Sequence, residues 1–220
     1  GIAQQGGESP SLTPALTDSL KKLLANASTA GAALPLVAKW DKAGALADVV
    51  KAQIANLSAK LTNNATAVGE RISAARALIG VGSADARATV VATLVEANSP
   101  EALQAEIINA LGDSGSVTEL VASMGKLQPK ALGLAFDAVL KRPEATLALL
   151  ASIADGKIEP KILGPGNIAR LRTHPNKNVA KQANAMMDKL NPGAKAKNEI
   201  IAKLTPEVEK PGNLANGKAM

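Results

Sequence analysis

A single histidine limits the chemistry that this chain can perform. His174 is the only histidine among 220 residues, and the chain contains no cysteine. A zinc site needs several histidine, cysteine or carboxylate ligands held close together, and neither a His-Glu-x-x-His motif nor a cysteine pair supplies them. A nucleophilic triad would have to use His174, which stands in the Thr-His-Pro-Asn sequence of residues 173–176, typical of a turn before a helix. We therefore predict a turn or capping role for His174.

Two other motifs that could bind a cofactor are better explained by helix packing. Gly80 and Gly82 match the first two glycines of a dinucleotide-binding fingerprint, but Asp85 occupies the third glycine position and no predicted strand precedes them. Met186 and Met187 resemble haem ligands only in residue type, because a methionine at a helical core position normally packs. The acidic residues show no paired-carboxylate spacing. The sequence thus predicts a chain that is not an enzyme and holds no metal or cofactor.

The positive charge of the chain is concentrated in its C-terminal third. Residues 157–220 contain twelve Lys or Arg and five Asp or Glu, a balance of +7, within a total of +6. Such asymmetry is found at surfaces for anionic partners and, more commonly, on solvated faces. HEAT-like solenoids bind duplex nucleic acid along basic faces, but stacking aromatic residues are absent here. The candidate interaction surface consists of Arg170, Arg172, His174, Lys177 and Lys181.

The composition predicts an all-α protein. Apolar residues make up 46% of the chain, and Trp40 and Phe136 are the only aromatic residues. Alanine allows helices to approach closely, whereas a β-sheet protein would contain more aromatic and β-branched pairs. No run of 18 apolar residues is present, so no membrane span is predicted. The chain begins with Gly1 in place of Met, which is compatible with removal of an export signal.

A loose repeat of about 30 residues organises the middle of the chain. The sequence Ala-Leu-Ile-Gly at residues 77–80 returns as Ala-Leu-Gly-Asp at 110–113 and as Val-Leu-Lys-Arg at 139–142, offsets of 33 and 29 residues. These offsets are typical of stacked two-helix units. Short loops between six amphipathic helices require consecutive helices to be antiparallel. We predict a right-handed α-α superhelix, a HEAT- or armadillo-like solenoid of antiparallel helix pairs.

The same patterns divide the chain into segments. We predict a single solenoid domain over residues 11–204. It comprises an N-terminal helical cap at 11–66, three HEAT-like repeats at 67–156 and basic C-terminal helices at 157–204. A disordered lead-in at 1–10 and a linker at 205–220 flank this domain.

Capping signals locate the individual helices. In the cap we expect a helix over residues 12–27, a break at 28–31, a short apolar segment that ends at residue 40, and a helix that carries residues 46–61. Trp40 is expected to pack on these elements. Ser83, Ser99 and Ser116, the last with Glu119, are predicted N-caps. Pro129 and Pro143 are predicted to begin helices, and Gly80 and Gly82 are predicted to end one. Later in the chain we expect a turn at 162–166, a helix over 167–172, a longer helix that ends at about residue 190, and a helix over 196–204.

Three segments of the C-terminal half resemble a known family. They are Phe136–Glu144 with Leu147–Leu150, Ile168–Asn176 and Gly212–Met220. In this order they are similar to the HEAT-like segment of large exported bacterial membrane-bound dehydrogenases. In that family a β-propeller of the glucose/sorbosone dehydrogenase kind precedes the helical repeats, and a small c-type cytochrome domain follows them. The resemblance covers about residues 70–220.

The resemblance implies a location and a role. Gly212, Asn213, Gly217 and Lys218 match the Gly-Asn-x-x-x-Gly-Lys segment that in the family shortly precedes a haem-binding Cys-x-x-Cys-His motif. No Cys-x-x-Cys-His and no propeller occur in this chain, so haem is expected only in a domain downstream of Met220. The family further implies an extracytoplasmic, periplasmic protein.

Two functions follow as hypotheses. The first is a non-catalytic scaffold that spaces or docks the dehydrogenase-like and cytochrome modules of one polypeptide. The second is an independent, monomeric solenoid that binds a protein partner or, less readily, nucleic acid.

Overall fold

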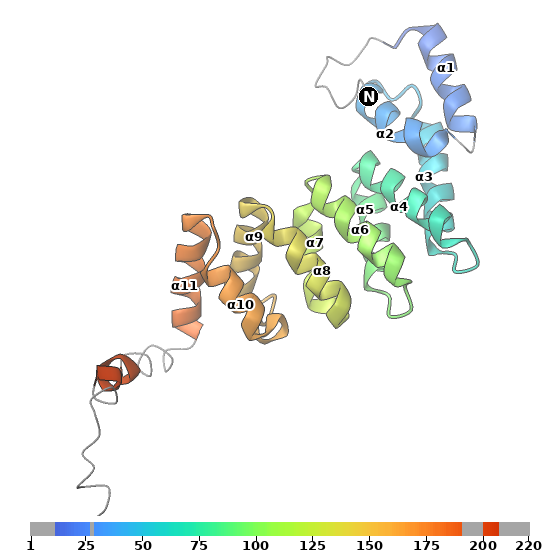
Figure 1. The fold of residues 1–220 in the computed structure, drawn as a ribbon. Helices are drawn as coiled ribbons and strands as arrows, with labels where there is room; N and C mark the ends of the chain where they lie inside the picture. The colour runs from blue at the N-terminus through green and yellow to red at the C-terminus, as the bar shows by residue number, and fades with distance from the viewer. Residues whose placement is uncertain (1–11, 27–28, 191–199, 207–220) are drawn as a thin grey trace, which may run out of the picture. The chain divides into compact units, whose positions relative to one another are not determined.

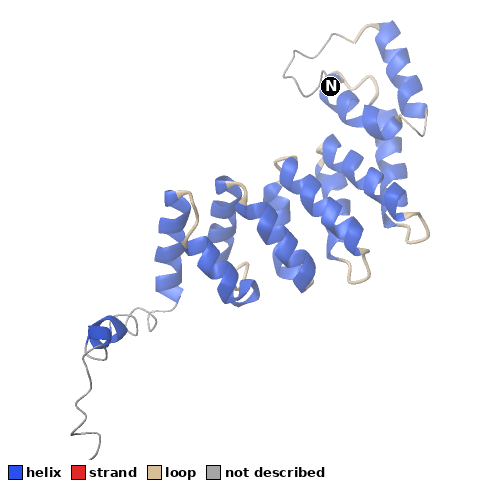
Figure 2. Ribbon diagram, viewed as in Figure 1, coloured by secondary structure: helices blue, strands red, loops and turns tan. Residues whose placement is uncertain are grey.

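The computed structural model describes residues 12–26, 29–190 and 200–206. Every regular element in these ranges is a helix, and no strand occurs in them, which confirms the predicted all-α class (Figure 2). The chain divides into two compact units, Gly1–Asn167 and Ile168–Met220. The predicted lead-in at 1–10 lies outside the described residues, as does the predicted linker apart from residues 205–206, which end a helical segment that begins at 200. No described helix is both long enough and apolar enough to span a bilayer.

Eleven α-helices precede the helical segment at residues 200–206 in the described part of the chain (Figure 1). Two 3₁₀ turns, Met124–Lys126 and Pro160–Leu163, separate some of them. The α-helices are α1 (Pro14–Ala25), α2 (Ala30–Trp40), α3 (Ala47–Thr62), α4 (Val68–Val81), α5 (Ala84–Val95), α6 (Glu101–Asp113), α7 (Val117–Ser123), α8 (Pro129–Leu140), α9 (Pro143–Ala154), α10 (Gly164–Arg172) and α11 (Lys177–Leu190).

Helices α4 to α9 pack in two alternating rows. Helix α4 contacts α6, and α6 contacts α8, while α5 contacts α7 and α7 contacts α9. Each helix also contacts its neighbour in the sequence, so every pair bridges the two rows. The fully buried side chains of this region include Leu78, Leu94, Ile107, Leu111 and Phe136. Their burial is the main favourable contribution to folding, since aliphatic and aromatic side chains gain about 1.5–3 kcal/mol each when removed from water.

Helices α1 to α3 enclose a second cluster, against which Val81 of α4 also packs. Leu20, Leu24, Leu34 and Val37 belong to it, and Trp40 packs against it as a partly buried residue, as predicted. The structure contains a break between the first two helices, as predicted, but α1 already ends at Ala25 and α2 begins at Ala30, before the end of the predicted break at 28–31. The predicted short apolar segment ends at Trp40 as expected and forms part of the longer helix α2. Burial of aliphatic side chains in this cluster offsets the roughly 3 kcal/mol that a proline in a helix interior costs.

A proline inside α2 sets the distance between α2 and α4. Pro35 lies against Gly80, and a Cβ atom at Gly80 would stand 2.7 Å from the proline Cγ and 3.1 Å from its Cβ. Gly80 is therefore required for close approach and lies within α4, so the prediction that it ends the helix is wrong. Gly82 does end the helix, in the left-handed conformation at φ 73°.

Replacing Gly80 with alanine should destabilise the protein by about 1–2 kcal/mol, because the rigid Pro35 ring cannot yield to the added methyl group. The matched control is Gly133→Ala in α8, where a Cβ meets nothing within 4 Å. That control should be stabilised by up to about 1 kcal/mol through helix propensity. Urea unfolding followed by circular dichroism measures both changes, and equal stabilisation of the two variants would refute the close contact.

The predicted helix caps were partly correct. The Ser83 hydroxyl accepts a hydrogen bond from the Ala86 amide at 3.3 Å, and Pro129 and Pro143 occupy the first helical positions, all as predicted. Ser99 and Ser116 do not cap their helices, because Pro100 is the residue that precedes α6 and Ser116 has a ψ of 44° instead of an extended conformation.

The predicted turn at residues 162–166 is also wrong. A 3₁₀ turn ends at 163, and α10 begins at Gly164 with Pro165 as its second residue. Proline in the first turn of a helix loses no intrahelical hydrogen bond, since the amides there have no partner in any case.

A hydrogen bond of one kind recurs where consecutive helices meet. The side chain at the fourth position of a helix donates to the carbonyl of the second-to-last residue of the helix before it. Arg71 Nε donates to the Leu61 carbonyl at 2.7 Å, Gln104 Nε2 to the Leu94 carbonyl at 3.1 Å, and Thr146 Oγ1 to the Val139 carbonyl at 3.0 Å. All three donors are buried. We call these the joint hydrogen bonds. Each is made to a carbonyl in the last turn of a helix, where carbonyls lack an intrahelical donor, and the Val139 carbonyl also accepts from the Arg142 amide at 3.2 Å.

Candidate interaction surfaces

The predicted basic surface lies on the second unit and is only partly available for binding. Arg172 ends α10, and its Nε donates to Asn184 Oδ1 at 2.7 Å while its Nη2 lies 3.6 Å from Asp188 Oδ1. Asn184 returns a hydrogen bond from its Nδ2 to the Arg172 carbonyl at 3.2 Å. Arg172 thus holds α10 and α11 together, and less of its charge is directed to solvent than the sequence suggests.

His174 participates in the turn between these helices. Its Nδ1 accepts a hydrogen bond from the Asn176 amide at 3.0 Å. Asn176 Oδ1 accepts in turn from the amides of Asn178 and Val179 and caps α11. The histidine therefore serves the turn and cap predicted from its sequence neighbours.

Two lysines remain as an exposed basic pair. Lys177 and Lys181 are one helical turn apart on α11, and neither has an ion-pair partner within the ranges that the structure describes. Lys177 lies in the first turn, where the helix dipole disfavours a cation. An anionic group bound beside it would relieve that unfavourable interaction. Arg170 is exposed one residue from the buried Leu171. Of the five predicted surface residues, Lys177 and Lys181 are the pair best placed to meet a partner.

The neighbouring core methionines play the predicted packing role. Val179, Ala183 and Met187 are buried on the inner side of α11, and Met186 is half-buried. Among the described residues, no three His, Cys, Asp or Glu side chains are grouped so that they could hold a metal ion.

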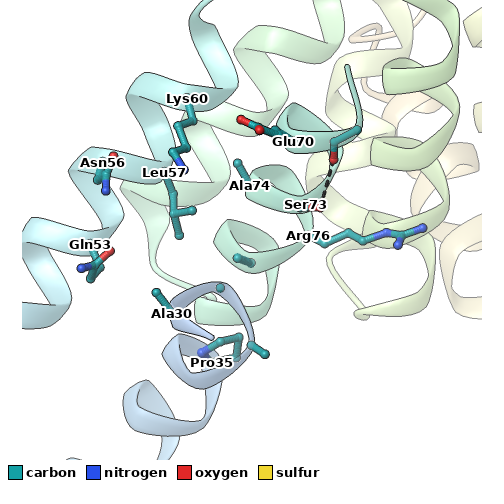
Figure 3. A pocket seen from close by; sticks show the side chains of 14 residues that line it. Ala30, Pro35, Gln53, Asn56, Leu57, Lys60, Glu70, Ser73, Ala74 and Arg76 are labelled. Carbon is teal, nitrogen blue, oxygen red and sulfur yellow. Dashed lines mark hydrogen bonds between the residues drawn. The ribbon is translucent and has the colours of Figure 1, made fainter. Parts of the chain in front are cut away.

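A second surface, which the sequence did not predict, is a groove on the first unit. It lies among α2, α3 and α4 and has a volume of about 720 Å³ (Figure 3). Its floor is built from small or apolar residues, namely Ala30, Gly31, Pro35, Leu57, Ala74 and Ala77. This volume is in the usual range of ligand-binding sites, about 300–1,000 Å³.

The walls of this groove are polar. Gln53, Asn56 and Lys60 line it from α3 at spacings of three and four residues, which places them on one helix face. Glu70, Ser73 and Arg76 line it from α4. Figure 3 shows Arg76 pointing away from α3, consistent with its ion pair to Glu106 on α6, while Ser73 donates to the carbonyl of Gly69 within its own helix.

The groove depends on a contact between segments distant in sequence. The approach of Pro35 to Gly80 and of Gly31 to Ala77 places α2 across the end of the α3–α4 pair. The spacing of the polar α3 residues could be read from the sequence, but the position of α2, which forms the third side of the groove, could not.

Comparisons of the chain with protein-family models, curated proteins and solved structures find no match.

Proposed function

We propose that this chain is a right-handed HEAT-like α-solenoid that acts as a non-catalytic scaffold, holding protein domains at a fixed separation. The observation that carries the proposal is that each helix from α4 to α7 packs against the next helix but one, and ion pairs join some of these helices. Arg76 of α4 pairs with Glu106 of α6, and Glu101 of α6 pairs with Lys130 of α8, at separations of 30 and 29 residues. In the other row, Arg87 Nε lies 3.1 Å from Glu119 Oε1.

Such repetition supports a quasi-one-dimensional array. The α6–α7 pair packs on both the α4–α5 pair and the α8–α9 pair, and joint hydrogen bonds tie α3 to α4, α5 to α6 and α8 to α9 at matching helix positions. In an array of this kind the length is set by the number of repeats, and the stability is a sum over repeats and their interfaces. A spacer needs both properties.

The register of the repeats can be tested through the Glu101–Lys130 pair. Its side chains are 70% and 71% exposed, so the coupling should be about 0.5 kcal/mol and should vanish in 1 M salt. The measurement is a double-mutant cycle of E101K, K130E and the charge-swapped double variant. Recovery of the wild-type stability by the double variant at low salt supports the predicted register, and strict additivity of the two changes contradicts it.

We further propose that the spacer belongs to an exported redox protein, between a dehydrogenase-like module and a c-type cytochrome domain. Support comes from the resemblance of residues 136–150, 168–176 and 212–220 to that family. The test is to read the gene beyond the codon for Met220. Codons for a Cys-x-x-Cys-His motif are expected shortly downstream, and their absence would refute the role as a spacer next to a cytochrome domain.

An independent binding role is the second candidate, and the exposed pair Lys177 and Lys181 favours it. Titration with duplex DNA over a salt series distinguishes the possible partners. A protein-binding role predicts no measurable DNA affinity, whereas a steep loss of affinity with salt would indicate phosphate contacts.

A further inference from the structure

The walls of the α2–α3–α4 groove carry polar side chains that the protein itself does not use. Gln53 and Asn56 on α3, Lys60 at the same wall and Glu70 on α4 have no hydrogen-bond or ion-pair partner in the described ranges of the chain. Gln53 and Lys60 are also half-buried, so part of each side chain is withdrawn from water. Two primary amides in a row offer both donors and acceptors along one wall.

The proline of α2 changes the hydrogen bonding of that helix. Pro35 has no amide N–H, so the carbonyl of Gly31, four residues earlier in α2, lacks its usual helical donor. Both residues line the groove.

We propose that this groove binds an extended peptide segment, recognised chiefly through its main chain. The row from Gln53 to Lys60 spans seven residues of helix, about 10 Å at 1.5 Å per residue, which matches about three residues of extended chain. Side-chain amides pair with peptide N–H and C=O groups, and the small floor residues admit a backbone at close range.

The charges of the groove select this occupant over others. Lys60 and Glu70 supply one cation and one anion, so their charges cancel and the groove favours a segment with little net charge. A nucleic acid would require a run of cations and stacking aromatic residues, and no aromatic residue lines the groove. A lipid surface would require large exposed apolar side chains, and the floor is made mainly of Ala, Gly and Pro.

This inference rests on the proposed scaffold function, because a scaffold needs a site where a partner attaches. The scaffold function and the peptide site can be refuted separately. The Glu101–Lys130 cycle tests the stacking of the repeats, whereas the peptide experiment tests only the groove.

The experiment uses the full chain and a displayed library of linear peptides of about twelve residues. Selected peptides are synthesised, and their affinity is measured by fluorescence anisotropy. We expect Q53A/N56A to weaken binding by about tenfold or more, because two hydrogen bonds to the peptide are lost. N-methylation of individual peptide amides should weaken binding by a similar factor at two or more positions. S73W, which fills the groove from an exposed position on α4, should abolish binding.

The control is Lys51→Ala, an exposed position of α3 that does not line the groove, and its affinity should stay within about twofold of wild type. Circular dichroism verifies that each variant remains folded. Failure to enrich any peptide over a blank support would overturn the proposal, as would equal affinity of the selected peptides for wild type and S73W. Sedimentation that reveals a dimer dissociated by S73W would overturn it in favour of a second copy of the chain.

Discussion

Replacing Phe136 with alanine is expected to lower the free energy of unfolding by about 4 kcal/mol, a loss that would leave a typical domain close to unfolding. Phe136 is fully buried in α8, a helix that contacts α6, α7 and α9. Removal of the ring leaves a cavity among four helices, and packed helices relax only partly into such a space. Denaturant unfolding followed by far-ultraviolet circular dichroism measures the loss. Phe136→Leu, which keeps most of the volume, should cost only about 1–1.5 kcal/mol.

The same variant tests whether the chain behaves as an array. Trp40 is the single tryptophan and packs on the separate cluster of α1 to α3. In a one-dimensional array a defect near α8 reaches that cluster only through the intervening helices. The fluorescence transition of Trp40 should therefore shift less in Phe136→Ala than the circular dichroism transition. Coincident transitions in the variant would mean that the first unit unfolds as one cooperative body, contrary to the solenoid proposal.

The second large effect is expected at Arg71, whose truncation to alanine should cost about 3 kcal/mol. This arginine is only 2% exposed, and its Nε donates to the Leu61 carbonyl at 2.7 Å. Its Nη2 is buried without a partner among the described residues. No carboxylate in the described chain pairs with it, but the C-terminal end of α3 offers the partial negative charge of its free carbonyls. The alanine variant loses both the packed side chain and this electrostatic contact.

Two comparison variants separate these contributions. Arg71→Met keeps the volume and removes the donor, so its cost, about 1–2 kcal/mol, reports the hydrogen bond alone. Arg76→Ala, on the same helix, removes an arginine whose side chain is 60% exposed and should cost under about 1 kcal/mol. Urea unfolding of all three variants is the measurement. Equal costs for the alanine variants at 71 and 76 would show that the joint is not a source of stability.

Local signals in the sequence predicted much of the secondary structure. Pro129, Pro143, Ser83 and Gly82 act through their own backbone or their immediate neighbours, and the structure confirms each of them. The extent of α2 could not be predicted in this way, because local propensity predicts that Pro35 interrupts a helix. The helix continues through Pro35 because its other residues are buried against neighbouring helices.

The candidate surfaces illustrate the same limit. The four-residue spacing of Lys177 and Lys181 predicted a shared exposed face, which the structure contains. Arg172 belonged to the same prediction, yet its partners Asn184 and Asp188 lie twelve and sixteen residues later, where no local pattern connects them. The burial of Arg71 could not be predicted from the sequence either, because arginine is rarely buried. Its role becomes clear only from the structure, where Arg71, Gln104 and Thr146 make the same joint hydrogen bond from the same helix position.

At the three joints, the hydrogen bond between the helix ends can align the two helices without help from the turn that connects them. Donor and acceptor are ten residues apart in two joints and seven in the third, yet they join the same positions of the two helices. Orientation is therefore set by the helix ends, and the turn only has to span the gap. Inserting a few flexible residues after Asn64 should cost only a few tenths of a kcal/mol in loop entropy. In a chain without cysteine, a single cysteine placed in such an insertion would attach one fluorophore or surface anchor at a defined site, which makes the turns natural points for engineering.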